Sequence, residues 1–456
     1  MKNFKRVIYI IPIALALITM QSCKKFLEVE PKDNVSDDLT IFDKASSETA
    51  VRGIYRGLAS DSYYGSGFVS IGYLGGDNIQ WTGSQSIVQD FINHNVKPEN
   101  ATVASAWSAI YNVINRANNV IAKVPAVNDN TFTTAARNQL VGEAYFIRAL
   151  AYFDLVRTWG GVQIVTTPTQ TASDKYGIAR STVAQTYAQV LSDLNTAESL
   201  LPLPTAQNPI RANRETVWAL KARYYLYNQD WVNAELLASQ VLANTNYYSL
   251  LKPFNTWFAN NAVATKESVF ELSYSATYTN GHRGSFQPPA NGGTRQIAPS
   301  PAYIALVNNP AIGGTRSTYI AQTSAGLWYA NLYYRSPATD PAYVIRIAEL
   351  YLIRAEARAQ QLKLIGANSA STDLNAVRDR AGLPVTTAVT QPDLLLAIEN
   401  ERRLEFPFEG HRWYDLVRTG RIQAVLGVTD ANKNVLPIPV TQLNADPALT
   451  PNPGYQ

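Results

Sequence analysis

The stretch ETVWALKARYYLYNQDWVNAELLASQVLA, residues 215–243, contains the clearest sign of how this chain folds. Trp218, Ala222 and Tyr225 follow one another at steps of four and three, which places them on one face of a helix. Asp230 then stands where a carboxylate would cap the start of a second helix. Small apolar residues recur along that second helix: Ala234, Ala238 and Val241. The segment therefore predicts two helices packed as a hairpin.

The order of large and small residues in this hairpin resembles the tetratricopeptide repeat, in which a small residue lies where two helices cross. Lys221 and Asn246 replace the Leu and Pro that are usual in the repeat, so we expect degenerate copies. Residues 181–202 predict a related helix, and a later segment carries another helical stripe: Ile345, Ala348, Leu352 and Ala355. Several hairpins should therefore stack side by side as a right-handed solenoid.

Further helices are predicted on both sides of this hairpin. Apolar residues recur at steps of three and four over 102–123 and, more densely, over 134–158. The second of these segments is apolar on two faces, so we expect it to lie between other helices. Near the C-terminus, Gly382 and Pro384 are well placed to end a helix, and Pro392 suits the first turn of the next.

Two regions interrupt the helical pattern. Residues 60–98 are rich in Gly, Ser, Asn and Gln, and residues 247–341 mix β-prone pieces such as SVFELSYSATY with Gly, Pro and Asn clusters. Long loops inside a compact domain are usually functional. We therefore expect one mainly α-helical domain over residues 38–456, with two irregular insertions and a few short strands.

The N-terminus has the form of an export signal. Basic residues precede the apolar run 7–20, which is too short to span a bilayer comfortably. Cys23, the only cysteine, follows this run and cannot form an intramolecular disulfide. The arrangement resembles the lipobox of bacterial lipoproteins, except that Met20 stands where Leu is usual. The alternative is an ordinary secretory signal with a chance cysteine.

The lipobox resemblance implies that residues 1–22 are removed and that Cys23 is acylated. Several acyl chains would anchor the protein stably, whereas one alone would be marginal. Residues 23–37 would then be a flexible lipid tether, because they are charged and lack periodicity.

The charge of the chain names no partner. The formal net charge of +4 falls to +1 when the three basic residues of the signal segment are removed: Lys2, Lys5 and Arg6. No run of Lys or Arg follows that could track a phosphate backbone, so we expect no nucleic-acid partner.

Five segments stand in order along the chain: CKKFLEVEP (23–31), EAYFIRALAYFDLVRTWGGVQI (143–164), VIRIAELYLIRAEA (344–357), LNAVRDRAGLP (374–384) and ENERRLEFPFEGHRWYDLVRTG (399–420). Together they resemble the SusD/RagB family of outer-membrane lipoproteins of the Bacteroidetes. The resemblance extends over nearly the whole mature chain.

This resemblance implies a tetratricopeptide-like scaffold with loop insertions. It also implies a cell-surface lipoprotein that captures oligosaccharides without catalysis and delivers them to a SusC-like TonB-dependent transporter. Alternatives are a lid for peptides or other nutrients, a glycan hydrolase, and a helical-repeat adaptor that binds a peptide. Surface-directed relatives generally carry acids directly after the cysteine, whereas here Lys24 and Lys25 come first, so surface or periplasmic orientation stays open.

The segment ERRLEFPFEGHRWYD has the composition of an active site. A glycosidase would need two carboxyl groups about 5 to 10 Å apart, one of them with a raised pKa. Neighbouring arginines would instead keep Glu401 and Glu405 ionised in ion pairs. We therefore expect no enzyme, and a structural network with Phe406, Phe408 and Trp413 as packing partners. Its members are Glu401, Arg402, Glu405, Arg412 and Asp415.

Metal and cofactor sites are not indicated. The three histidines, His94, His282 and His411, are far apart in sequence, and none belongs to an HExxH motif. Nucleotide-binding and GxSxG signatures are absent from the sequence.

Candidate ligand contacts come from the two insertions, where loops can present aromatic rings and amides to a sugar. In the family the early loop commonly contributes to the ligand site, and Trp81 is our first choice there. Its polar companions are Asp77, Asn78, Gln80 and Gln85. The second insertion offers Tyr274, Tyr278, His282, Arg283, Trp328, Tyr329, Tyr333 and Tyr334. Packing inside the protein or against the transporter is the alternative for each.

Overall fold

The structure is a computed structural model that describes residues 40–171 and 173–455. The predicted signal peptide (1–22), the lipidation site Cys23 and the tether (23–37) lie outside these described residues. The described chain is mainly helical with a few short strands, as the sequence predicts. Among its helices, none is both long and apolar enough to cross a membrane.

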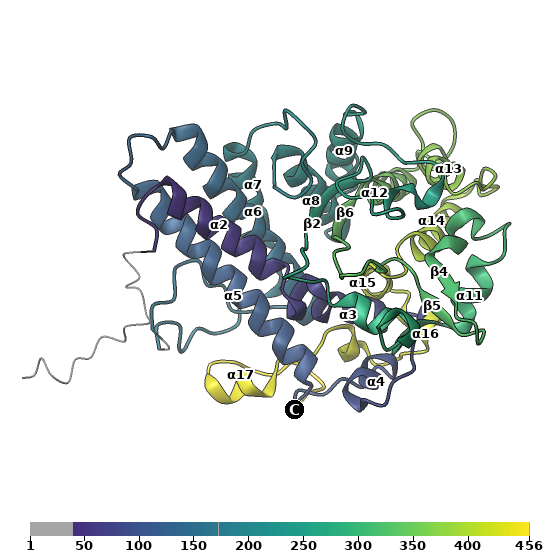
Figure 1. The fold of residues 1–456 in the computed structure, drawn as a ribbon, viewed down its shortest axis with the longest axis horizontal. Helices are drawn as coiled ribbons and strands as arrows, with labels where there is room; N and C mark the ends of the chain where they lie inside the picture. The colour runs from purple at the N-terminus through teal and green to yellow at the C-terminus, as the bar shows by residue number, and fades with distance from the viewer. Residues whose placement is uncertain (1–39, 172, 456) are drawn as a thin grey trace, which may run out of the picture.

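Four long helices form one half of the molecule and lie at the left of Figure 1. They are α2 (Lys44–Leu58), α5 (Ala101–Lys123), α6 (Thr134–Trp159) and α7 (Val183–Leu200). Asn100 and Thr133 cap α5 and α6 by accepting backbone N–H bonds. Helix α6 is buried on almost every side because α5 and α7 both pack against it. The predicted helix between helices is therefore confirmed.

The central hairpin is present as predicted. It consists of α8 (Arg214–Tyr227) and α9 (Trp231–Leu242), and the Asp230 carboxylate accepts the N–H of Asn233 at 3.1 Å. Helix α12 (Ile347–Gln360) packs against both helices of the hairpin. It also contacts α13 (Ala370–Arg380) and α14 (Gln391–Glu405), which continue the stack of helices.

The expected helical stripe that begins at Ile345 is wrong at its first residue. Ile345 belongs to strand β6 (Ala342–Arg346), which pairs antiparallel with β2 (Ser268–Leu272), and the helix begins only at Ile347. Because this strand is buried on both faces, its residues are apolar without the alternation typical of strands. In the sequence, its apolar residues therefore look like a continuation of the helix that follows. Only pairing with a strand far away in sequence separates the two elements.

The first insertion is less irregular than its composition suggested. Its elements are a π-helical turn (Asp61–Gly65), α3 (Gly67–Leu74), β1 (Ile79–Trp81) and α4 (Ser86–Ile92). Helix α3 is buried along its length. A Cβ at Gly72 would lie only 2.1 Å from the carbonyl oxygen of Gly410. The glycine there therefore permits close packing of backbones.

The second insertion contains short strands, short helices and 3₁₀ turns. Its elements after β2 are α10 (His282–Phe286), β3 (Ile297–Pro299), α11 (Pro301–Val307), β4 (Ile320–Gln322) and β5 (Trp328–Ala330). Strand β3 pairs antiparallel with β1, and β4 pairs antiparallel with β5. Figure 1 places α11, β4 and β5 at the right of the molecule. The chain ends in three short helices: α15 (Arg412–Arg418), α16 (Ile422–Leu426) and α17 (Val440–Ala445).

Candidate functional site

Strand pairing brings the two insertions together around Trp81. In β1, Trp81 lies opposite Ile297 of β3, and β3 lies alongside β5, which begins with Trp328. Arg295, just before β3, donates from Nε to the carbonyl oxygen of Trp328 at 2.8 Å. The β1–β3 pair, which carries our first-choice residue of the early loop, therefore lies beside the β4–β5 pair, which carries a tryptophan of the late insertion.

Both tryptophans are partly exposed and are supported by the core of the protein. Trp81 and Trp328 each pack in part against the hydrophobic core, whereas Tyr329 does not. Successive residues of a strand point to opposite faces, so Trp328 and Tyr329 diverge. Gln85 is exposed at the start of α4, shortly after Trp81. We call Trp81 and Trp328 the aromatic ledge.

Trp81 is held by its own loop. A Cβ at Gly83 would lie 2.3 Å from Cζ2 of the Trp81 ring, so the backbone of Gly83 lies close to the indole. Thr82 donates its backbone N–H to the Gln296 carbonyl oxygen at 2.8 Å, which ties the loop to β3. The indole Nε1 is buried and has no hydrogen-bond acceptor in the described protein. The ring is thus fixed in place before any ligand arrives.

The polar residues before Trp81 hold the loop and have little surface for a ligand. Asp77 pairs with Arg412 at 2.7 Å and with Arg403 at 3.0 Å. Asn78 is buried, accepts from Nε of Arg403 at 2.9 Å and donates to the Arg403 carbonyl oxygen at 2.9 Å. Gln80 donates to the Pro299 carbonyl oxygen at 2.9 Å.

Tyr274 and Tyr278 belong to a different part of the surface. Their rings stack with centroids 6.0 Å apart, and the guanidinium group of Arg56 from α2 lies over the ring of Tyr278. Tyr278 also donates its hydroxyl to the Arg56 carbonyl oxygen at 3.1 Å. Tyr278 lines a separate hollow of about 310 Å³ beside α2. The pair therefore adds nothing to the ledge.

His282 and Arg283 are occupied by the protein itself. His282 is buried with its ring stacked 4.5 Å from that of Tyr333, and burial lowers its pKa to about 3, so the imidazole is neutral. Arg283 donates to the carbonyl oxygens of Tyr334, at 3.4 Å, and Asn291. Our expectation of a surface contact from His282 is therefore not supported, because α10 packs its ring into the core.

The paired glutamates of the C-terminal motif have partners that are distant in sequence. Glu401 and Glu405 share Arg316, at 2.5 and 2.9 Å, and Glu405 also pairs with Arg346 and Arg380. Burial alone would raise the pKa of Glu405, yet these three guanidinium groups lower it to about 2. The carboxylate is therefore ionised at neutral pH.

Their sequence neighbours pair elsewhere. Arg402 donates from Nε to Asp415 at 2.7 Å, and Asp415 also accepts from Arg418 at 2.9 Å. Burial opposes ionisation of Asp415, but the two guanidinium groups outweigh it and lower its pKa. Arg412, which pairs with Asp77, also forms a longer ion pair with Glu399 at 3.4 Å. The expected Arg402 and Arg403 partners of Glu401 and Glu405 are thus replaced by arginines of other elements.

Comparison with known proteins gives the family. A model described as "Starch-binding associating with outer membrane" matches residues 25–226, and the SusD family model matches residues 329–455. The chain belongs to the SusD family. SusD-like protein P38 of Formosa agariphila is 26% identical to it over the full length of both chains. A SusD-like protein of Bacteroides ovatus is 25% identical over 89% of this chain and 81% of its own.

Solved structures of SusD-like proteins share the fold. A laminarin-binding SusD-like protein is 26% identical, with a TM-score of 0.79 over 91% of this chain and 100% of that one. A SusD superfamily protein from Bacteroides thetaiotaomicron is 25% identical, also with a TM-score of 0.79, over 90% of this chain and 100% of its own. The overall fold of this SusD-family chain is therefore that of its relatives.

In this SusD-family protein, sequence reasoning missed the residues whose hydrogen bonds hold the strands of the aromatic ledge together. Arg295 and Thr82 tie β5 and the early loop to β3, but neither stands in a motif. The only sequence feature that could have pointed to them is that each lies next to a short β-prone segment. Within the described part of the chain, no three His, Cys, Asp or Glu side chains come close enough to hold a metal ion.

Proposed function

We propose that this protein is a lipid-anchored outer-membrane protein that captures an oligosaccharide on the aromatic ledge. It would pass the intact ligand to a SusC-like TonB-dependent transporter. The observation that carries this proposal is that Trp81 and Trp328, one from each insertion, lie on two neighbouring strand pairs, β1–β3 and β4–β5. Rigid, partly exposed indole rings suit the apolar face of a pyranose, and neighbouring amides such as Gln85 suit its hydroxyls.

Laminarin is the first ligand to test. A laminarin-binding SusD-like protein shares 26% identity and the fold with this chain, and one matching family model is described as starch-binding. Both glucans expose the same sugar ring through different linkages. A comparison of laminari- and malto-oligosaccharides therefore asks which linkage geometry follows the ledge.

The proposed function involves no bond cleavage. A glycosidase needs one carboxyl group that is protonated near neutral pH and a second across an open cleft. In the C-terminal motif, Glu405 and Asp415 are instead held ionised by guanidinium groups, and Glu405 is buried. These acids are better suited to joining helices than to transferring protons.

Anchoring and partner follow from the sequence and the family. Cys23 would carry the acyl chains, which would insert into the outer membrane, and the protein would meet the nutrient at the cell exterior. The family model described as associating with the outer membrane supports the location. Copurification with a large barrel protein encoded beside this chain would support the transporter as partner.

Calorimetric titration tests the ligand site. Laminarihexaose and maltohexaose are titrated into wild type, Trp81→Ala, Trp328→Ala and a control, Tyr176→Ala, which removes a ring that is 60% exposed elsewhere. We expect one of the sugars to bind and each ledge variant to bind it at least about tenfold more weakly, or ~1.4 kcal/mol. Equal affinities for all four proteins would remove the ledge from the site, and chromatography of the sugar afterwards would reveal any cleavage.

A further inference from the structure

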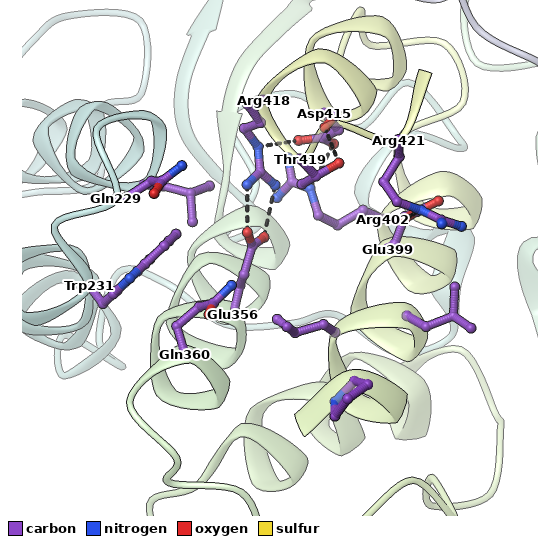
Figure 2. A pocket seen from close by; sticks show the side chains of 14 residues that line it. Gln229, Trp231, Glu356, Gln360, Glu399, Arg402, Asp415, Arg418, Thr419 and Arg421 are labelled. Atoms are coloured by element: carbon purple, nitrogen blue, oxygen red, sulfur yellow. Dashed lines mark hydrogen bonds and ion pairs between the residues drawn. The ribbon is translucent and has the colours of Figure 1, made fainter. Parts of the chain in front are cut away.

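A second hollow lies between the tetratricopeptide-like helices and the C-terminal helices. This cleft has a volume of about 590 Å³, within the range of small-ligand sites, and no ledge residue lines it. Figure 2 shows Gln229 and Trp231 on one side and Glu399 and Arg421 on the other. The remaining labelled residues close the space between these two sides: Glu356, Gln360, Arg402, Asp415, Arg418 and Thr419.

The charges that line the cleft balance one another. Glu356 accepts from both Nη atoms of Arg418, at 2.6 and 2.8 Å, as the dashed lines of Figure 2 indicate. Asp415 accepts from Arg402 and Arg418, and Glu399 accepts from Arg421 at 2.9 Å. Three carboxylates thus face three guanidinium groups. An ionic ligand would find no uncompensated charge here, so the lining favours a neutral one.

One buried donor in this lining is unused. Arg402 is 4% exposed, and its Nε is engaged by Asp415. Its Nη1 is buried and has no acceptor in the described protein. A buried N–H without a partner is unfavourable, so a small movement of the Arg402 side chain toward the cleft would let a ligand oxygen satisfy it. Arg402 therefore holds an unused donor in the wall of the cleft.

The walls add apolar surface and amides. The ring of Trp231 is partly exposed, and Leu395 and Leu396 contribute apolar surface from α14. Gln229 offers an exposed amide, while Gln360 accepts one long bond of 3.5 Å from Gln391, which leaves its NH₂ group for a ligand. An indole face with surrounding amide and guanidinium donors matches a pyranose, which is apolar on its faces and polar around its rim.

We propose that this cleft is a second saccharide site that takes one or two neutral pyranose units. Trp231 would contact a sugar face, Arg402 Nη1 would donate to a hydroxyl or ring oxygen, and Gln360 would donate to another hydroxyl. This goes beyond the capture proposed for the ledge, because the two sites share no residue. The cleft would bind a short saccharide, whereas the aromatic ledge would bind a longer chain.

The test follows the Trp231 indole N–H by NMR in ¹⁵N-labelled Trp81→Ala protein, in which the ledge is impaired. Loss of one signal in Trp231→Phe assigns it. Glucose, laminaribiose and glucuronate are titrated separately. We expect a saturable shift with glucose and laminaribiose, and Gln360→Ala should weaken both by about three- to tenfold. Val232→Ala, which truncates a 65% exposed neighbour of Trp231, serves as the matched control and should leave both unchanged.

Three results would overturn the proposal. The first is a Trp231 signal that neither neutral sugar moves, and the second is equal affinities for Gln360→Ala and Val232→Ala. The third is glucuronate binding more than tenfold tighter than glucose, which would contradict the neutral ligand. The change in hexaose affinity between wild type and the variants Trp81→Ala and Trp328→Ala reports on the ledge alone, so failure of one site is distinguishable from failure of the other.

Discussion

Arg412 of α15 and Asp77 of the early loop form an ion pair in which Arg412 Nε lies 2.7 Å from Asp77 Oδ1. Asp77 comes just before strand β1, which carries Trp81. The C-terminal motif therefore fixes the point at which the ledge strand leaves the helical scaffold. The C-terminal motif has the composition of an active site, yet its contribution to the proposed binding surface is to hold the strand of Trp81 in place.

Breaking this pair should loosen the early loop. Arg412→Ala leaves Asp77 with Arg403 alone, and we expect the free energy of unfolding to fall by about 2 kcal/mol, since Arg412 is buried. Urea unfolding measures the change. Arg52→Ala is the control, because its contact with Glu48 is exposed and 3.9 Å long, and it should cost less than about 0.5 kcal/mol. Equal losses in both variants would refute the anchoring role.

Gly72 should tolerate no side chain. A Cβ there would meet the Gly410 carbonyl oxygen at 2.1 Å, so Gly72→Ala must push α3 away from the C-terminal motif. We expect a loss of roughly 2 to 3 kcal/mol in thermal or urea unfolding. Gly284→Ala in α10 is the matched control, since its Cβ would meet no atom within 4 Å. It should be neutral or slightly stabilising, and a Gly72→Ala protein as stable as this control would contradict the packing.

Buried carboxylates should make stability depend on acid pH. Burial tends to raise the pKa values of Glu349 and Glu405, but neighbouring arginines lower both to about 2, below the ordinary 4.5. Because the folded pKa values are lowered, their contribution is present above pH 4.5 and is lost as pH falls toward 2. We expect the free energy of unfolding to drop by roughly 3 kcal/mol or more across this window.

Urea midpoints between pH 7 and pH 2.5 check this dependence. In Glu405→Gln the drop should be smaller, although the variant starts from a lower stability at pH 7 because three arginines lose their shared carboxylate. A wild-type midpoint that stays constant from pH 4.5 to pH 2.5 would show that these groups titrate no differently in the folded protein.

Membrane attachment should depend on one thiol. Cys23→Ser in the full chain should abolish incorporation of an alkyne-labelled fatty acid, because only a cysteine thiol accepts the lipid in the lipobox reaction that the sequence resembles. Met20→Leu, which restores the usual lipobox residue, should keep the label. Gel fluorescence after labelling of cells measures both, and label retained by Cys23→Ser would exclude this anchor.

The helices were predictable because their signals are local. The spacing of Trp218, Ala222 and Tyr225 gives α8, and Asp230 caps α9 as expected, since both depend on residues within a turn or two. Ile345 failed for the opposite reason. Its strand exists only because β2, distant in the sequence, pairs with it.

The candidate site was predictable only as a list of residue types. Composition pointed to Trp81 and Trp328, but the β1–β3 pairing and the contact of β3 with β5 decide that their strands are neighbours. The same composition pointed to His282, which tertiary packing buries against Tyr333. Rings that can bind and rings that pack are chemically alike, so only long-range contacts separate them.

A crystal structure of the protein with laminarihexaose or maltohexaose tests the central proposal most directly. We predict an intact hexasaccharide with a sugar ring against the indole of Trp81 and another against that of Trp328. A hexasaccharide bound away from both rings, or electron density for cleaved fragments only, would contradict it.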